Sequence, residues 1–316
     1  MKAIIWGSRG SLPAPVRPDV ITSKITTALK AAANHTFGSD EDIMQFIETQ
    51  LPFSVKGTYG ANTSCVELRD EEAYVLFDAG TGLRDFGNHI LREASAPCHF
   101  HIFISHLHWD HIQGLPFFVP AYIKENKISL YGCHPDMKAA FLRQQSPPFF
   151  PVPFDALQAD IDFVRLDAGK QYDIAGYMVH TCEQDHPGTS YGYRLEKKSK
   201  SFVYSTDSEH KEDSSEQVEP FLRFIDNADL LIFDAQYSLM EAISTKENWG
   251  HSSNMVGVEL AVRAKVKHLC MFHSEPTHDD ETLDKLLHNT RKYARLHDES
   301  YPLEVSLAYD GLEIDI

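Results

Sequence analysis

The chain has 316 residues, of which 42% are hydrophobic and 24% charged, so it is long enough to bury a sizeable globular core. Its formal net charge is −17, and an acidic surface repels polyanions, which disfavours long nucleic acid as a partner. No apolar run approaches the ~18 residues of a membrane helix, and the five scattered cysteines lack CxxC spacing, so we expect reduced thiols in a cytoplasmic protein without a membrane anchor.

The first fifth of the chain alternates between extended and helical patterns. A short strand is predicted at 2–6, followed by the glycine-containing loop Gly7–Pro13. Apolar spacing then predicts a helix at 21–32, and Ser39 with the acidic residues after it begins a second helix that ends near Gln50. We interpret 14–55 as a helical insertion. It is a lid over the functional site, a surface insertion or an oligomer contact.

A hairpin and a buried strand come before the most informative stretch of the chain. Cys65–Leu68 and Ala73–Phe77 predict two paired strands, and Asp78 follows the second of them. Residues 83–93 have a helical pattern, and 100–104 form an apolar run that predicts a buried strand. We expect the carboxylate of Asp78 to bind backbone donors of the loop after that strand and to play a supporting role there.

Three imidazoles and a carboxylate follow the predicted buried strand within six residues. His106 and His108 are two positions apart, so they leave an extended chain on the same side. Asp110 and His111 come after the bend and can point elsewhere. Histidine and aspartate at this density are typical of a metal site, and this one loop can serve two neighbouring ions.

The rest of the chain continues to alternate strands with helices, without an obvious linker. Strands are predicted at 128–131, 161–166, 177–182, 191–195, 201–205, 230–233, 268–272 and 303–308. Helices are predicted at 218–226, 254–264 and 281–296. Between them, 144–154 carries several prolines and phenylalanines, which predict irregular structure that either walls an apolar pocket or packs on the core.

Four further residues at strand ends or loops are candidates for the same site. His186 lies in a loop before a Pro-Gly turn, Asp207 follows strand 201–205, and His273 follows strand 268–272. A carboxylate such as Asp207 can bridge two cations with its two oxygens. His251 precedes the helix at 254, where the helix dipole would lower the pKa of its imidazole. It is either a proton donor in catalysis or a cap of that helix.

These residues together resemble the metallo-β-lactamase superfamily. The resemblance rests on its HxHxDH motif, an upstream aspartate and the later landmarks in the family's order: His106, His108, Asp110, His111, Asp78, His186, Asp207 and His273. Within the superfamily the chain is most similar to the phosphodiesterase branch, which includes tRNase Z and the phosphoribosyl cyclic phosphodiesterases. The stretches that resemble this branch are Gly192-Tyr193-Arg194, Gly250-His251-Ser252, Gly7–Ser11 and Gly60–Ser64.

The resemblance implies an α/β fold of the αβ/βα four-layer sandwich type, with 1–316 as a single domain. It implies that His106, His108 and His186 bind one metal ion, that Asp110, His111 and His273 bind a second, and that Asp207 bridges the two. Imidazole and carboxylate donors suit Zn²⁺, with Mn²⁺ or iron as alternatives. The loops that carry Ser8, Arg9, Asn62 and Thr63 would lie near the site and bind substrate.

The activity expected from this ligand set is hydrolysis. A hydroxide shared by two metal ions would attack phosphorus, Asp110 would orient it, and His251 would protonate the leaving alkoxide. The chain lacks the long Gly/Pro-rich arm with which tRNase Z grips tRNA, and it is acidic, so we expect a small cyclic or nucleotide phosphodiester as substrate.

Two other functions remain open, as does a homo-oligomeric state. The same metal site would hydrolyse an ester, thioester or lactone without a leaving-group acid. Alternatively, a non-hydrolytic diiron protein would bind oxygen or act as a sensor.

Overall fold

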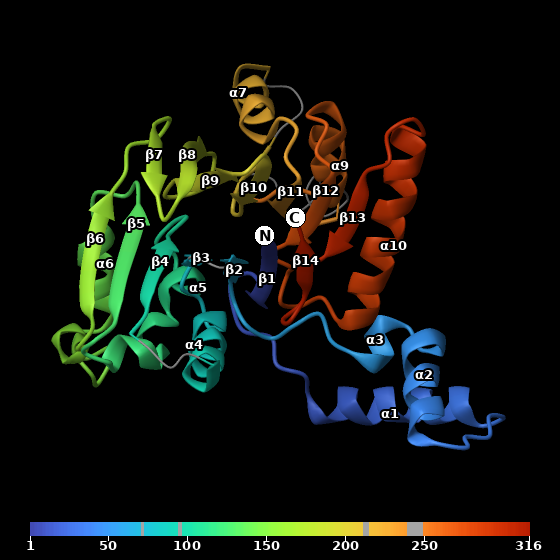
Figure 1. The fold of residues 1–316 in the computed structure, drawn as a ribbon. Coiled ribbons are helices and arrows are strands. Elements are labelled where there is room, and N and C mark those ends of the chain that lie inside the picture. The colour runs from blue at the N-terminus through green and yellow to red at the C-terminus, as the bar shows by residue number, and fades with distance from the viewer. Residues whose placement is uncertain (71–72, 94–96, 211–214, 239–248) are drawn as a thin grey trace.

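The computed structural model describes residues 1–70, 73–93, 97–210, 215–238 and 249–316. Within these ranges the strands form two seven-stranded sheets, which lie face to face with helices outside them (Figure 1). None of the helices in this part of the chain is both long and apolar enough to cross a membrane.

The first sheet has the strand order β14-β1-β2-β3-β4-β5-β6. Its strands are β1 (Lys2–Gly7), β2 (Cys65–Arg69), β3 (Tyr74–Phe77), β4 (His99–Phe103), β5 (Lys127–Gly132), β6 (Asp160–Arg165) and β14 (Glu313–Asp315). Strands β3 to β6 run parallel, whereas β1 pairs antiparallel with β2 and with β14. The two ends of the chain therefore meet in one sheet, with Lys2 opposite Asp315.

The second sheet has the order β13-β12-β11-β10-β9-β8-β7. Its strands are β7 (Gln171–Ile174), β8 (Tyr177–Gln184), β9 (Ser190–Lys197), β10 (Lys200–Ser205), β11 (Leu230–Asp234), β12 (His268–Phe272) and β13 (Glu304–Leu307). Strands β10 to β13 run parallel, and β7 to β10 form an antiparallel meander. The carboxyl ends of the parallel strands in a sheet meet at one edge, where ligand-binding loops commonly gather.

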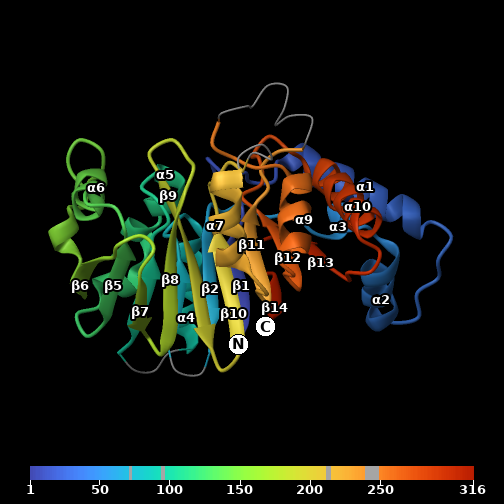
Figure 2. The same cartoon turned by 90° about the horizontal axis from the view of Figure 1, so that it is seen from above.

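Three apolar clusters separate four layers. The first lies between the sheets, where Phe77 of β3 stacks on Phe103 of β4, with ring centroids 5.6 Å apart, and contacts Tyr204 of β10. The second packs helices on the outer face of the second sheet, and the third packs helices on the outer face of the first sheet. These helices are α4 (Gly82–Glu93), α5 (Trp109–Ile112), α6 (Met137–Gln144), α7 (Ser215–Ile225), α9 (Asn254–Arg263) and α10 (Asp280–His297). The expected αβ/βα sandwich is confirmed (Figure 2).

The predicted insertion is helical and consists of α1 (Pro18–Ala32), α2 (Asp40–Gln50) and α3 (Phe53–Lys56). It projects from one side of the sandwich beside α10 (Figure 1). Helix α1 has no buried residue and packs against α3. Its Lys24 donates to the carbonyl of Gly57 at 2.5 Å, and the same ammonium lies 2.5 Å from a carboxylate oxygen of Asp280 at the start of α10.

Nearly all of the predicted strands and helices are confirmed, with ends shifted by a few residues. The sequence analysis did not predict α3, α5, α6, β7 and β14. The segment after α6 is irregular up to a short 3₁₀ turn at Phe154–Ala156, as its prolines indicate.

Candidate metal centre

Each predicted metal ligand lies in a turn directly after a strand. The loop after β4 carries the cluster from His106 to His111, and α5 begins within it at Trp109. His186 lies between β8 and β9, Asp207 follows β10, and His273 follows β12. Asp207 and His273 have φ values of 52° and 61°, in the left-handed region that is uncommon outside glycine. Such backbone conformations often mark functional sites, because the surrounding structure must hold them.

The first group of ligands contains three imidazoles. His186 Nε2 lies 3.2 Å from His108 Nδ1 and 3.8 Å from Asp207 Oδ1. His106 Nε2 lies 3.7 Å from the same oxygen of Asp207. Ligand atoms of His106, His108 and His186 all lie within 4.8 Å of one another, which is close enough to hold one ion.

The second group contains two imidazoles and a carboxylate. His111 Nε2 and His273 Nε2 are 3.2 Å apart, and each lies 3.2 Å from Asp110 Oδ2. The other carboxylate oxygen of Asp207, Oδ2, lies 3.2 Å from His111 Nε2 and 3.4 Å from His273 Nε2. The two oxygens of Asp207 therefore face different ligand groups, which is the arrangement that a bridging carboxylate requires.

The donors fit divalent cations. Burial and the neighbouring imidazoles lower the pKa of His106, and burial is also the main cause that lowers the pKa values of His108 and His186. These rings are thus held neutral, which is the form that binds metal. His106 Nε2 is buried without a hydrogen-bond partner although it points toward Asp207, so a metal ion there would satisfy it.

Asp78 supports the second group through His111. Its Oδ1 accepts a hydrogen bond from the Ser105 backbone N–H at 2.7 Å, and its Oδ2 lies 2.7 Å from His111 Nδ1. Tyr204 donates to the same Oδ2 at 2.8 Å. A carboxylate on the far nitrogen of a histidine fixes the tautomer and leaves Nε2 free to bind metal. The equivalent partner of His186 is the backbone carbonyl of Gly250, 2.8 Å from its Nδ1.

The structure corrects the expectation for His251. Helix α9 is capped by Ser253, whose hydroxyl accepts from the Val256 N–H at 3.3 Å, so His251 is not the cap. The ring of His251 instead places Nδ1 2.9 Å from Asp234 Oδ2 and 3.9 Å from Asp207 Oδ1. Burial opposes the charged ring, but these carboxylates outweigh it and raise the pKa of His251 to about 9. The predicted lowering by the helix dipole is wrong.

Asp234 is the site residue that the sequence analysis missed. It is fully buried at the end of β11, and it accepts backbone N–H bonds from Ser208 at 3.1 Å and Gln236 at 3.2 Å as well as contacting His251. The sequence contains a pattern that could have identified it, because Asp234 lies at the end of an apolar strand, as Asp78 and Asp207 do.

The four residues predicted to bind substrate are all buried, with side chains bonded to neighbouring loops: Ser8, Arg9, Asn62 and Thr63. Ser8 donates to the Tyr59 carbonyl at 3.1 Å, and Asn62 donates to Asp85 at 2.7 Å. Their assignment to substrate binding stays a prediction.

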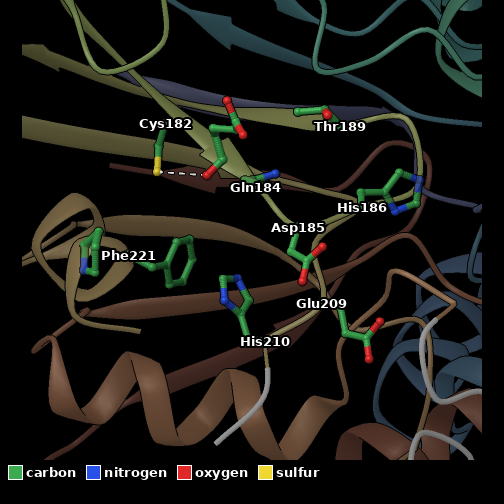
Figure 3. A pocket seen from close by; sticks show the side chains of 10 residues that line it. Cys182, Gln184, Asp185, His186, Thr189, Glu209, His210 and Phe221 are labelled. Atoms are coloured by element: carbon green, nitrogen blue, oxygen red, sulfur yellow. Dashed lines mark hydrogen bonds between the residues drawn. The ribbon is translucent and has the colours of Figure 1, made fainter. Parts of the chain in front are cut away.

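A cavity of about 380 Å³ adjoins the first ligand group (Figure 3). His186, Asp185, Glu209 and His210 are among the residues that line it. The ring of His210 is tilted by 36° against that of Phe221, which also lines the cavity, with ring centroids 4.0 Å apart. The cavity thus offers carboxylate acceptors and an aromatic surface beside the candidate metal centre.

Comparison with known proteins places this geometry in a family context. The profile of the beta-lactamase superfamily domain matches residues 73–274. Ribonuclease Z from Exiguobacterium sibiricum is 22% identical over 266 residues, which cover 70% of this chain and 85% of that protein. Two solved structures share the fold over the whole chain: a diphosphatase from the PhnP family (TM-score 0.60, 18% identity, 97% of that chain) and human tRNase Z, short form (TM-score 0.58, 19% identity, 99% of that chain).

Proposed function

The chain belongs to the beta-lactamase superfamily as a metal-dependent hydrolase, and we propose that it is a binuclear phosphodiesterase that cleaves a small cyclic or nucleotide phosphodiester. The observation that carries the proposal is the position of Asp207, whose Oδ1 faces the three-imidazole group and whose Oδ2 faces the group with Asp110. A carboxylate whose two oxygens face different ligand groups can bridge two cations.

His106, His108 and His186 would hold one ion, and Asp110, His111 and His273 the other, with Zn²⁺ as the best match and Mn²⁺ or iron as alternatives. When bound, a pair of divalent ions supplies a water of lowered pKa and positive charge for the phosphoryl oxygens. The protein's part is to orient the attacking water through Asp110 and to keep the three histidines of the first group neutral.

His251 is the proposed general acid. Its ring lies beside Asp207, which places it next to both ligand groups, and Asp234 holds its proton on Nδ1. Loss of an alkoxide from phosphorus needs a proton, whereas an acyl ester with a good leaving group does not. A protonated imidazole at this position therefore favours a phosphodiester over an acyl ester as substrate.

The acidic surface supports a small substrate. With a net charge of −17, the chain loses the counterion-release contribution that drives binding to long nucleic acid. The cavity beside His186 is wide enough for a small organic group, and its carboxylates favour a group that carries hydrogen-bond donors.

The test is an activity screen on protein of known metal content. We expect hydrolysis of bis-p-nitrophenyl phosphate, and of at least one cyclic nucleotide or dinucleotide, to exceed hydrolysis of a p-nitrophenyl acyl ester. The reverse preference would favour the ester hydrolase, and a coloured iron protein without hydrolysis would favour the diiron function.

Cleavage of precursor tRNA is the second candidate, because relatives named ribonuclease Z match up to 94% of their own length. Precursor tRNA is therefore included in the screen. A higher kcat/KM for that RNA than for every small diester would replace the small-substrate proposal with a nuclease.

A further inference from the structure

The N-terminal loop Ser8–Ser11 contacts two ligands of the second candidate ion, Asp110 and His273. The backbone N–H of Ser11 donates to Asp110 Oδ2 at 2.8 Å, which is the oxygen that faces His111 and His273. The Gly10 N–H donates to the carbonyl of Ser274, directly after His273, at 3.0 Å. Among the described residues, no hydrogen bond or ion pair joins this loop to His106, His108 or His186.

Gly10 lies against the ring of His273. A Cβ atom at position 10 would be 2.5 Å from His273 Nδ1 and 2.6 Å from its Cε1, closer than side-chain carbons approach other atoms. The backbone of Gly10 is not in the left-handed region, so the absence of a side chain serves the close approach and not an unusual φ. Among the described residues, His273 Nδ1 has no hydrogen-bond partner, and Gly10 packs against the ring at this nitrogen. The rings of His111 and His251 stack on His273, with centroids 5.2 and 5.1 Å away.

Arg9 anchors the loop from within the protein. Its side chain is 3% exposed, and it donates to the carbonyls of Gly60 at 3.1 Å, Glu275 at 3.2 Å and His278 at 3.0 Å. Its remaining nitrogen lies 3.9 Å from Asp280. A guanidinium with several fixed donors holds a loop more rigidly than a lysine would.

Asp280 links this anchor to the helical insertion. Its Oδ1 accepts from the Tyr59 N–H at 2.8 Å, and its Oδ2 lies 2.5 Å from the ammonium of Lys24 on α1. A continuous set of contacts thus runs from α1 through Asp280 and Arg9 to the ligands of the second ion.

We propose that Gly10 and Arg9 are positioning residues for the second ion alone, and that the helical insertion strengthens this effect through Lys24. The inference rests on the proposed binuclear centre and assigns the loop Ser8–Ser11 a role in metal affinity. The first ion has a different support, because His186 is held by the carbonyl of Gly250.

The test compares two glycine substitutions, one beside each ligand group, by metal titration of the metal-free protein. Gly250 has a φ of 83°, so its substitution also strains the backbone. Gly10→Ala pushes on His273, and Gly250→Ala pushes on His186, because a Cβ at either position would lie 2.5 Å from the ring's Nδ1. Substitution of a residue that orients a metal ligand typically weakens metal binding about 10- to 100-fold. We expect Gly10→Ala to weaken the binding of the second ion by that factor and to leave the affinity for the first ion unchanged.

X-ray absorption of the protein loaded with one equivalent of zinc identifies the ion that remains. We expect about three imidazoles around it in Gly10→Ala and about two in Gly250→Ala, as the ligand sets predict. Gly38→Ala is the control, because position 38 is an exposed loop glycine whose nearest contact would be Asp42 at 3.1 Å. It should bind both ions as the wild type does.

Two results would overturn the inference. One is wild-type affinity for both ions in Gly10→Ala. The other is loss of the first ion, the one bound by three imidazoles, in that variant. Should Gly10→Ala fail to fold, Arg9→Lys, which keeps the charge but not the fork of donors, must show the same selective loss, and equal loss of both ions there refutes the proposal. Failure of the wild type to bind two ions would instead refute the binuclear centre itself.

Discussion

His251 shows what a single residue's surroundings add to its sequence position. From the sequence, a histidine before a helix is either a cap or a catalytic group, and the helix dipole suggests a lowered pKa. The structure brings Asp234, which is 17 residues away, to 2.9 Å from its ring and reverses the sign of the pKa shift. The dipole effect is small beside a buried carboxylate at hydrogen-bond distance.

Replacing His251 by alanine tests its role as general acid. We expect kcat for a diester with an alkoxide leaving group, such as a cyclic nucleotide, to fall about 100- to 10,000-fold, as is typical for loss of a positioned acid. The metal content should stay at the wild-type level, and the loss should be much smaller for bis-p-nitrophenyl phosphate, because p-nitrophenolate leaves without being protonated. Loss of metal would make His251 a ligand, and unchanged kcat would leave it without a role in proton transfer.

His101 provides a pH-dependent prediction away from the metal centre. Burial, followed by the charge of His99, lowers the pKa of His101 from its ordinary value of 6.5 to about 4. Below pH 6.5 the unfolded chain takes up a proton that the folded protein does not, so stability falls as pH drops toward 4.

We therefore expect His101→Gln to lose less stability than the wild type on acidification. Thermal unfolding of both metal-free proteins at about pH 7 and about pH 4.5 measures the difference, because the metal-binding histidines titrate alike in both. Parallel loss of Tm would show that His101 does not contribute.

At the scale of elements, local pattern was sufficient wherever a strand or helix was long. The parallel strands are apolar runs bounded by turns, and α10 has a clear amphipathic repeat, so both were predicted. Strand β14 has three residues and exists because Ala3 pairs with Ile314 across the whole chain, which no local window contains. Strand β7 joins β8 through Ala175 and Gly176, both with positive φ, and an alanine does not indicate such a turn.

The cap of α9 allows a prediction at this scale. Ser253→Ala removes the hydroxyl that accepts from the Val256 N–H, which should lower the free energy of unfolding by about 1 kcal/mol. Denaturant unfolding measures this loss. The value of kcat should change far less than in His251→Ala, because His251 is held by Asp234 and not by the cap. A loss of kcat comparable with that of His251→Ala would show that the position of His251 depends on the cap.

For the molecule as a whole, the resemblance to the superfamily predicted the ligand set and its division between two ions, but not the positions of the ligand atoms. His106, Asp110 and Asp207 could be named from the motif, whereas the position of each oxygen of Asp207 depends on two sheets meeting. The supporting contacts of Asp78 with Tyr204 and of Gly10 with His273 also join separate halves of the chain. Such contacts carry no local signal, because they arise only when the sandwich closes.

Removal of metal should destabilise the whole protein. Asp110, Asp207 and Asp234 are buried close together, and ions that bind only the folded state stabilise it, by about 4 kcal/mol when free metal is about 1,000 times the dissociation constant. Dialysis against a chelator should lower Tm by several degrees, and zinc should restore it. Identical melting of metal-free and zinc-loaded protein would argue against ions in this buried centre.

The most direct test is to titrate metal-free protein with zinc while following hydrolysis of bis-p-nitrophenyl phosphate. Because Asp207 faces two ligand groups, the account predicts that activity rises through the second equivalent of zinc per chain and levels off there. A plateau at one equivalent, or two bound ions without phosphodiester hydrolysis, would contradict it.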